Sequence, residues 1–178
     1  DLIRYWWRIR SHRFRTVLEP GGDVVGFYLM LPADEARAAP QDPVTKGWLD
    51  HLDEGGPEPG QTLFIRRWMS REDGESPSPV QAACWLDIKR TYMEMRPELR
   101  RVYLTVRDFA PYADAADELG FEHSSDLQQV VDGEAYGSAW LDFGPASVDG
   151  WLRGLAAAEL GVEVSDSELL DHDARELV

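Results

Sequence analysis

Residues 62–81 read TLFIRRWMSREDGESPSPVQ, which predicts a β-strand, a polar loop and the start of a helix. The strand is expected over 62–69, where aliphatic and aromatic residues gather. Three signals indicate the helix start: Ser78 is a good N-cap, Pro79 suits the first helical position, and Gln81 can complete a capping box. The helix should end before Pro97, with a buried stripe of Val80, Ala83, Cys84, Ile88, Thr91, Tyr92 and Met95.

The segments on either side continue the alternation of strands and helices. Upstream, the pattern predicts a helix over 1–12 and a hairpin that joins strands over 14–19 and 24–31. The elements expected downstream are a strand over 101–106, a helix over 110–119 closed by Gly120, a hairpin of 127–131 with 138–143 around Asp132-Gly133, and a helix over 148–160. This order predicts an α/β (α+β) fold in which helices flank a mixed, largely antiparallel sheet.

Residues 33–61 differ from the rest because they are rich in proline and glycine. A single short amphipathic piece, 44–52, lies between the breakers and is expected to be helical. We therefore expect 33–61 to be a surface insertion. Two alternatives stay open for it, a functional lid and a tolerated insertion.

Composition excludes several classes of protein. The 178 residues include 18 Lys and Arg against 33 Asp and Glu, a net charge of −15, which disfavours nonspecific binding to nucleic acid. The single cysteine, Cys84, excludes a disulfide framework and is expected to be core packing. No window suits a membrane span and no signal peptide opens the sequence, so we expect a cytoplasmic protein. The missing initiator Met suggests a piece of a longer chain.

The loop and helix start within 62–81 suit a phosphate group. A polar loop that ends at a helix N-terminus offers unpaired backbone N–H groups and the positive end of the helix dipole. The pattern Arg71-x-x-Gly74-x-Ser76 resembles the R/Q-x-x-G-x-G/A signature of the GNAT N-acetyltransferase superfamily. Leu119-Gly120-Phe121 at a helix end and Val25-Gly26-Phe27 in the first hairpin are also similar to that superfamily.

The resemblance covers about residues 1–143 and implies acetyl-CoA as the acyl donor, with a small amine as acceptor. The residues that it assigns to the cofactor are Trp68, Met69, Arg71, Gly74, Ser76 and Ser78. The sequence also departs from the family, because it begins at what looks like the second helix. Glu72, Asp73 and Glu75 place carboxylates in the phosphate loop, so the chain resembles a degenerate or truncated member.

The general acid of the family is a tyrosine three residues before Leu-Gly-Phe, and here that position is Ala116. Phe109 likewise replaces an asparagine of the family. Tyr112, one helical turn before Ala116, is the substitute catalytic candidate, and its alternative role is a ring packed on the sheet.

Candidates for a general base are few. The strand that leads into the loop carries Arg66 and Arg67 where a carboxylate would serve, and His123 could reach the cleft or stay solvated. No His, Asp and Glu residues have metal-ligand spacing, so we expect no metal site.

Three functions remain open: an acetyl-CoA-dependent N-acetyltransferase, a catalytically inactive ligand-sensing or scaffolding domain, and a protein-interaction domain. The segment 169–178 resembles the entry strand of winged-helix domains in bacterial regulators, which suits a fragment of a larger, transcription-regulating protein. We therefore expect a GNAT-like domain over 1–144, followed over 145–178 by a helix and an acidic tail that would start a further domain. Neither membrane nor nucleic-acid binding is expected of this segment.

Overall fold

The computed structural model describes residues 2–39 and 41–163, and within them seven strands are paired. The strand order is β1-β2-β3-β4-β7-β5, with β6 paired to β7. All recorded pairs are antiparallel except β3 with β4. The strands are β1 Phe14–Leu18, β2 Val24–Pro32, β3 Thr62–Ser70, β4 Arg101–Val106, β5 Glu122–His123, β6 Gln129–Val131 and β7 Glu134–Asp142. The expected mixed, largely antiparallel sheet is confirmed.

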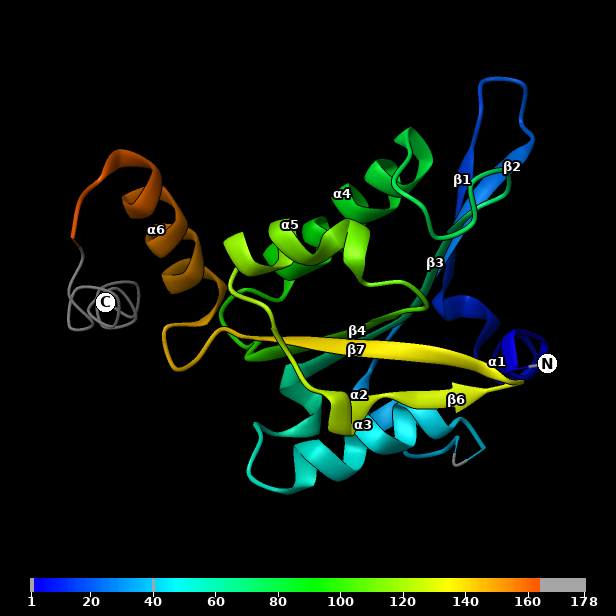
Figure 1. Ribbon diagram of the computed structural model, residues 1–178, viewed down its shortest axis with the longest axis horizontal. Coiled ribbons are helices and arrows are strands. Elements are labelled where there is room, and N and C mark those ends of the chain that lie inside the picture. Colours follow the sequence, from blue (N-terminus) through cyan, green and yellow to red (C-terminus); the bar gives the residue numbers. More distant parts are fainter. Residues whose placement is uncertain (1, 40, 164–178) are drawn as a thin grey trace.

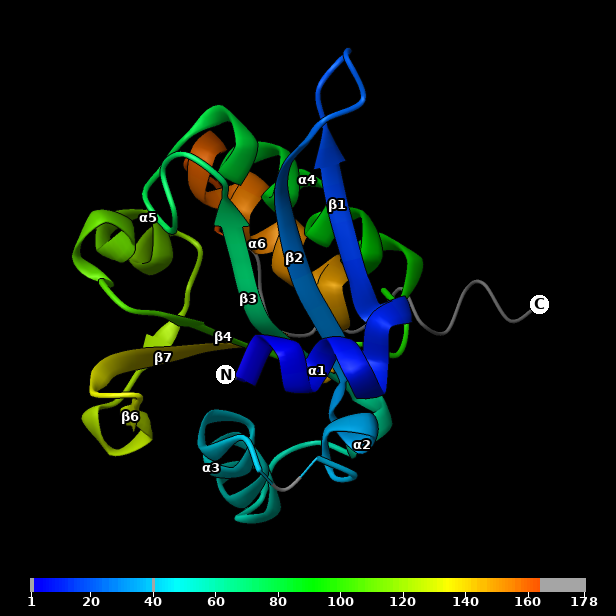
Figure 2. The same cartoon turned by 90° about the vertical axis from the view of Figure 1, so that its right-hand side faces the viewer.

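Helices cover both faces of this sheet (Figures 1 and 2). One face is covered by α1 Leu2–Arg10, α2 Ala33–Ala36 and α3 Pro43–Asp53. The opposite face is covered by α4 Pro79–Glu94, α5 Ala113–Glu118 and α6 Ser147–Leu160. Short 3₁₀ turns lie at Ser11–Arg13, Pro59–Gln61, Ala110–Tyr112 and Ser125–Leu127. The chain therefore forms three layers, with helices on either side of the strands.

Each face of the sheet has its own apolar core. Successive residues of β3 alternate between them, so that Leu63 and Ile65 face α4 while Phe64 faces α3. Cys84 is buried in the core on the α4 face, as expected of a packing residue. The α4 face also includes Val148 and Trp151 of α6, so this helix packs on the same core as the rest of the domain.

Residues 33–61 are not a surface insertion, and that prediction is wrong. They form α2 and α3 and bury Val44, Trp48 and Leu52 completely or nearly so against the sheet. Asp42, which is 0% exposed, caps α3 by accepting from the Val44 amide, and its carboxylate also accepts from Trp6 Nε1 at 2.7 Å. Pro43 at the start of α3 is a helix-start signal rather than a loop breaker. The apolar residues of α3 complete the core on the α3 face of the sheet.

Smaller differences have local causes. The helix expected over 110–119 begins as a 3₁₀ turn, and α5 starts at Ala113, after Pro111. Ala83, expected in the buried stripe of α4, is exposed. The last hairpin turns at Asp132 and Gly133, which both have positive φ, as the sequence indicated.

Among the described residues, no helix is long and apolar enough to cross a membrane. The predicted winged-helix entry strand at 169–178 lies outside the described residues. The assignment of 145–178 to a following domain stays a prediction.

Candidate functional site

The candidate site begins where β3 and β4 part. Their parallel pairing runs from Thr62 with Arg101 to Ile65 with Leu104, and both strands then continue beyond it. The pairing of β3 with β2 shifts register at the same level, because Leu29 pairs with Arg67 and Met30 with Ile65. A bulge of this kind bends the strand that contains it. Beyond Ile65 and Leu104 the two strands are no longer paired and diverge, which leaves a wedge between them (Figure 2).

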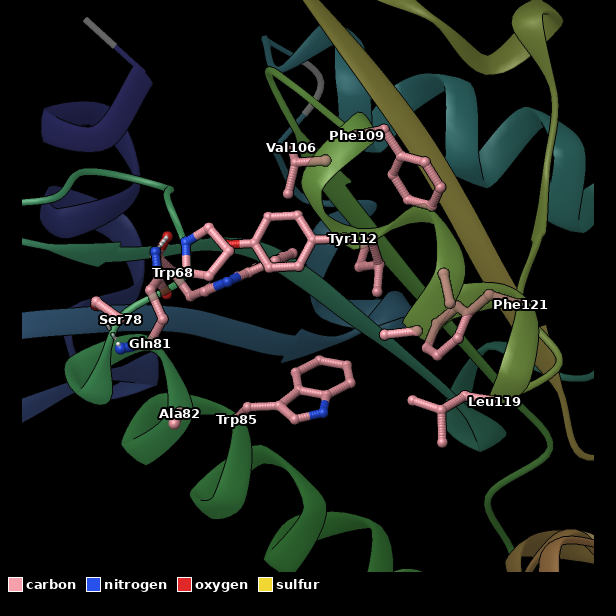
Figure 3. Close-up of a pocket in the computed structure, with 14 residues that line it drawn as sticks. Trp68, Ser78, Gln81, Ala82, Trp85, Val106, Phe109, Tyr112, Leu119 and Phe121 are labelled. Carbon is pink, nitrogen blue, oxygen red and sulfur yellow. Dashed lines mark hydrogen bonds between the residues drawn. The ribbon is translucent and has the colours of Figure 1, made fainter.

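An aromatic cavity of about 260 Å³ lies beside this wedge, between α4 and α5. Figure 3 shows the rings of Trp68, Trp85, Tyr112 and Phe121 around a common space. The other lining residues are Pro77, Ser78, Gln81, Ala82, Leu104, Val106, Phe109, Ala115, Ala116 and Leu119. Pockets for drug-sized molecules usually measure about 300–1,000 Å³, so this one suits an apolar segment of a ligand.

Tyr112, the predicted catalytic residue, lies in the cavity wall with its hydroxyl already engaged. The hydroxyl donates to the backbone oxygen of Glu75 and also interacts with the Trp68 side chain. Burial raises the pKa of Tyr112, which keeps the phenol protonated at neutral pH. Its proton is therefore present but committed to a backbone carbonyl. Ala116 lines the same cavity and offers no proton.

The loop that follows β3 uses most of its own backbone N–H groups. The Glu72 and Asp73 amides donate to Ser70 Oγ at 3.3 and 3.2 Å. The Gly74 amide donates to Ser70 O and the Ser76 amide to Asp73 O, while the Arg71 amide donates to Val25 O of β2. Pro77 and Pro79 have no N–H to offer. The expectation of several unpaired amides in this loop is therefore wrong for residues 71–74 and 76.

Ser78 is the N-cap of α4, as predicted, because its hydroxyl accepts from the Gln81 amide at 3.2 Å. The predicted capping box does not form. Gln81 Nε2 instead donates to the backbone oxygens of Gly74 at 2.7 Å and Trp68 at 3.4 Å. These two acceptors fix the orientation of the side-chain amide, and Gln81 Oε1 is buried with no hydrogen-bond partner in the described part of the chain.

Glu75 ties the loop to the ends of β3 and β4. Its carboxylate forms an ion pair with Arg67 of β3, and the two side chains are only 10% and 9% exposed. Glu75 Oε2 also accepts from the Arg107 amide at 2.9 Å, just past β4. A second cavity of about 240 Å³ lies here, lined by Asp73, Gly74, Glu75, Ser76, Arg107, Asp108 and Pro111. Three of these residues carry carboxylates and one carries a cation.

The structure brings only part of the predicted cofactor set to one place. Trp68 and Ser78 line the aromatic cavity, whereas Gly74 and Ser76 line the second cavity. Met69 is half-buried and Arg71 is exposed, and neither lines the aromatic cavity.

The other titratable candidates have structural partners. Arg66 is buried and donates from Nε to Asp42 Oδ2 at 2.5 Å, and His123 is exposed beside the Phe109 ring. In residues 2–39 and 41–163, no group of three or more His, Cys, Asp or Glu could hold a metal ion.

The sequence reasoning missed Ser70, Gln81, Trp85 and Phe121 as site residues. Trp85 could have been found, because it lies four residues after Gln81 and so on the same face of α4. Ser70 had no comparable signal, since its capture of two amides depends on how the loop turns.

No family model and no curated protein matches this chain. Several solved structures have a similar fold. A CoA-dependent acyl-homoserine lactone synthase, BjaI, with SAM and isopentyl-CoA, is 14% identical with a TM-score of 0.49, over 96% of this chain and 83% of that one. Another such synthase, MesI, is 16% identical with a TM-score of 0.47, over 88% of this chain and 73% of that one.

An apo form of an agmatine N-acetyltransferase variant is 9% identical with a TM-score of 0.47, over 79% of this chain and 81% of that one. These likenesses concern the fold and assign no activity to this chain.

Proposed function

We propose that this chain is a GNAT-like domain that binds an acyl thioester of the CoA type in the wedge between β3 and β4. The observation that carries the proposal is the parting of the two parallel strands beside an aromatic cavity. Where strands part, the backbone edge of each can bond an extended ligand chain. The apolar lining then removes that chain from water, which favours binding by about 25 cal/mol per Å² of apolar surface buried.

The side chains around the cavity suit the arm of such a ligand. Trp68 and Trp85, with ring centroids 6.1 Å apart, would pack against its methylene groups. The Gln81 side chain lines the same cavity, and its amide nitrogen is held by the backbone oxygens of Gly74 and Trp68. Ser78 lies at the cavity wall at the start of α4. The assignment of Met69, Arg71, Gly74 and Ser76 to the same ligand stays a prediction from the resemblance.

Transfer of the acyl group to a small amine is the activity that the resemblance implies. Such a reaction needs a proton for the departing thiolate, and a positioned acid contributes about 10²–10⁴-fold in rate. Tyr112 has its hydroxyl proton engaged with Glu75 O, and Ala116 has none, so water would have to supply the proton. An N-acetyltransferase built on this site would therefore be slow.

Binding without transfer, as in a ligand-sensing domain, is the second candidate function. The engaged hydroxyl of Tyr112 favours it, because this tyrosine holds the cavity wall to the loop instead of facing a ligand atom as a free donor.

The test is calorimetric titration with acetyl-CoA and hexanoyl-CoA in two matched variants of α4. Both Ala82 and Ala83 are exposed, but only Ala82 lines the cavity. Ala82→Trp should weaken binding at least about tenfold by filling the cavity mouth, and Ala83→Trp should leave it unchanged. Equal affinities in the two variants would place the ligand elsewhere.

Release of free thiol in the presence of an amine panel then separates the two candidates. Turnover that disappears in Tyr112→Phe while binding persists would make Tyr112 a catalytic acid. Binding with no turnover in the unaltered protein would identify a sensor.

A further inference from the structure

The end of the site that would face the phosphates of CoA is already satisfied from within. Hydrogen bonds to Val25 O, to Ser70 and to Asp73 O engage the amides of residues 71–74 and 76, and Pro77 and Pro79 have no N–H, so most of the amides that could cradle a pyrophosphate are already used. Ser70 Oγ alone accepts from two of these amides. This loop is folded around a serine hydroxyl rather than around an anion.

The charges at this end also oppose a phosphate. Asp73, Glu75 and Asp108 line the second cavity, and its single cation, Arg107, has its guanidinium Nε 3.7 Å from Glu75 Oε2. A pyrophosphate in this cavity would be repelled by the three carboxylates, because like charges repel at short range. The one arginine there already faces Glu75.

Rearranging the loop to receive a phosphate would break buried contacts. Three contacts of Glu75 hold the loop in place: its ion pair with Arg67, the hydrogen bond that its carboxylate accepts from the Arg107 backbone amide, and the hydrogen bond that its backbone oxygen accepts from the Tyr112 hydroxyl. Separating a buried ion pair leaves both charges uncompensated in a poorly solvated place. A phosphate contact would have to offset that loss before it contributed any affinity.

The aromatic cavity has the opposite character. Its lining carries no charged side chain, and four of its walls are the rings of Trp68, Trp85, Phe109 and Phe121. A neutral, apolar chain is the chemistry that fits this lining.

Resting on the proposed function, we infer that the site selects a neutral acyl-pantetheine-type thioester and gains no affinity from the pyrophosphate and nucleotide of CoA. The ligand class is thus an uncharged thioester, recognised through its apolar arm. The affinity for an acyl-CoA is therefore the affinity for its acyl-pantetheine arm alone.

Titration of the 178-residue chain with three probes tests this inference: hexanoyl-CoA, hexanoyl-pantetheine and adenosine 3′,5′-bisphosphate. We expect the two thioesters to bind within about threefold of each other and the nucleotide not to bind. Because no phosphate contact contributes, raising the salt concentration should change the affinity for hexanoyl-CoA little.

Arg71→Gln provides a second measurement in a residue that is exposed, so the fold should survive the change. We expect the affinity for hexanoyl-CoA to stay within about threefold, since a charge-assisted phosphate contact would be worth more than that. A hexanoyl-CoA affinity at least about tenfold above that of hexanoyl-pantetheine, lost with Arg71, would overturn the inference and leave the proposed function standing. Failure of both thioesters to bind would overturn the proposed function and the inference with it.

Discussion

The Arg67–Glu75 ion pair gives the most demanding test of the site geometry. Both side chains are about nine-tenths buried, and the Glu75 carboxylate forms the ion pair with the Arg67 guanidinium. The same guanidinium lies 5.3 Å from the centre of the Tyr136 ring. Glu75→Gln removes the charge but keeps an oxygen that can accept from the Arg107 amide. The variant therefore isolates the cost of leaving Arg67 buried without its counter-charge.

Removing one partner of a buried ion pair costs about 3–5 kcal/mol. The residual exposure of about one tenth lets some water reach the pair, so the lower end, about 3 kcal/mol, is expected. For a chain of this length each kcal/mol lowers the melting temperature by about 2–4 °C, which gives a decrease of about 6–12 °C. Denaturant titration followed by tryptophan fluorescence measures the free energy of unfolding directly.

Two further variants control the interpretation. Arg67→Met should cost less than Glu75→Gln, because Glu75 keeps the amide and guanidinium of Arg107 as neighbours. The double variant should recover most of the Glu75→Gln loss, since no buried charge is left on Arg67. A Glu75→Gln protein with the stability of the unaltered chain would refute the reasoning, because it would show that the pair is solvated.

Three other predictions concern stability and reactivity. Gly26→Ala should lower the melting temperature, since an added Cβ would lie 2.7 Å from a backbone oxygen, and Gly21→Ala, with open space around it, should not. The thiol of Cys84 should resist alkylation at about pH 8 until the chain unfolds, because burial raises its pKa to about 11. The hydrogen bond from Arg13 holds the pKa of Glu35 below 4.5, so Glu35 stabilises the fold above that pH and loses the effect as the pH falls through its lowered pKa. The unfolding free energies of Glu35→Gln and the unaltered protein should therefore converge between about pH 6 and about pH 3, measured by denaturant titration.

Local signals in the sequence predicted most of the fold. The Ser78 cap, the Gly120 helix end and the turn at 132–133 depend on residues that lie next to one another in the chain. Each is set by backbone geometry that a short segment determines by itself. The order of the strands in the sheet was not predicted, because it depends on pairing between segments that lie far apart in the chain.

The segment 33–61 shows where such signals fail. Its role depends on Asp42, which meets Trp6 from the first helix and Arg66 from the third strand. A buried carboxylate with partners 36 and 24 residues away cannot be distinguished in the sequence from a solvated one. The density of proline and glycine then favoured a loop, although Pro43 begins a helix.

The candidate site was predicted in part for the same reason. Trp68, Ser78 and Tyr112 were found because each lies at the end of an element, where side chains converge. The walls contributed by Trp85 and Phe121 come from elements that meet only in three dimensions.

The pair formed by Tyr112 and Ala116 bears on what the cavity is for. A tyrosine at 116 would place its ring in the space that the methyl group of Ala116 now leaves open. The tyrosine present at 112 instead holds its hydroxyl against Glu75 O, at the wall between the cavity and the loop. The cavity thus has open volume at Ala116, where the resemblance implies a proton donor, and the hydroxyl of Tyr112 is engaged in a structural hydrogen bond. Neither position 112 nor position 116 thus offers a free side-chain proton to a leaving group in the cavity. Residue by residue, this favours binding over transfer.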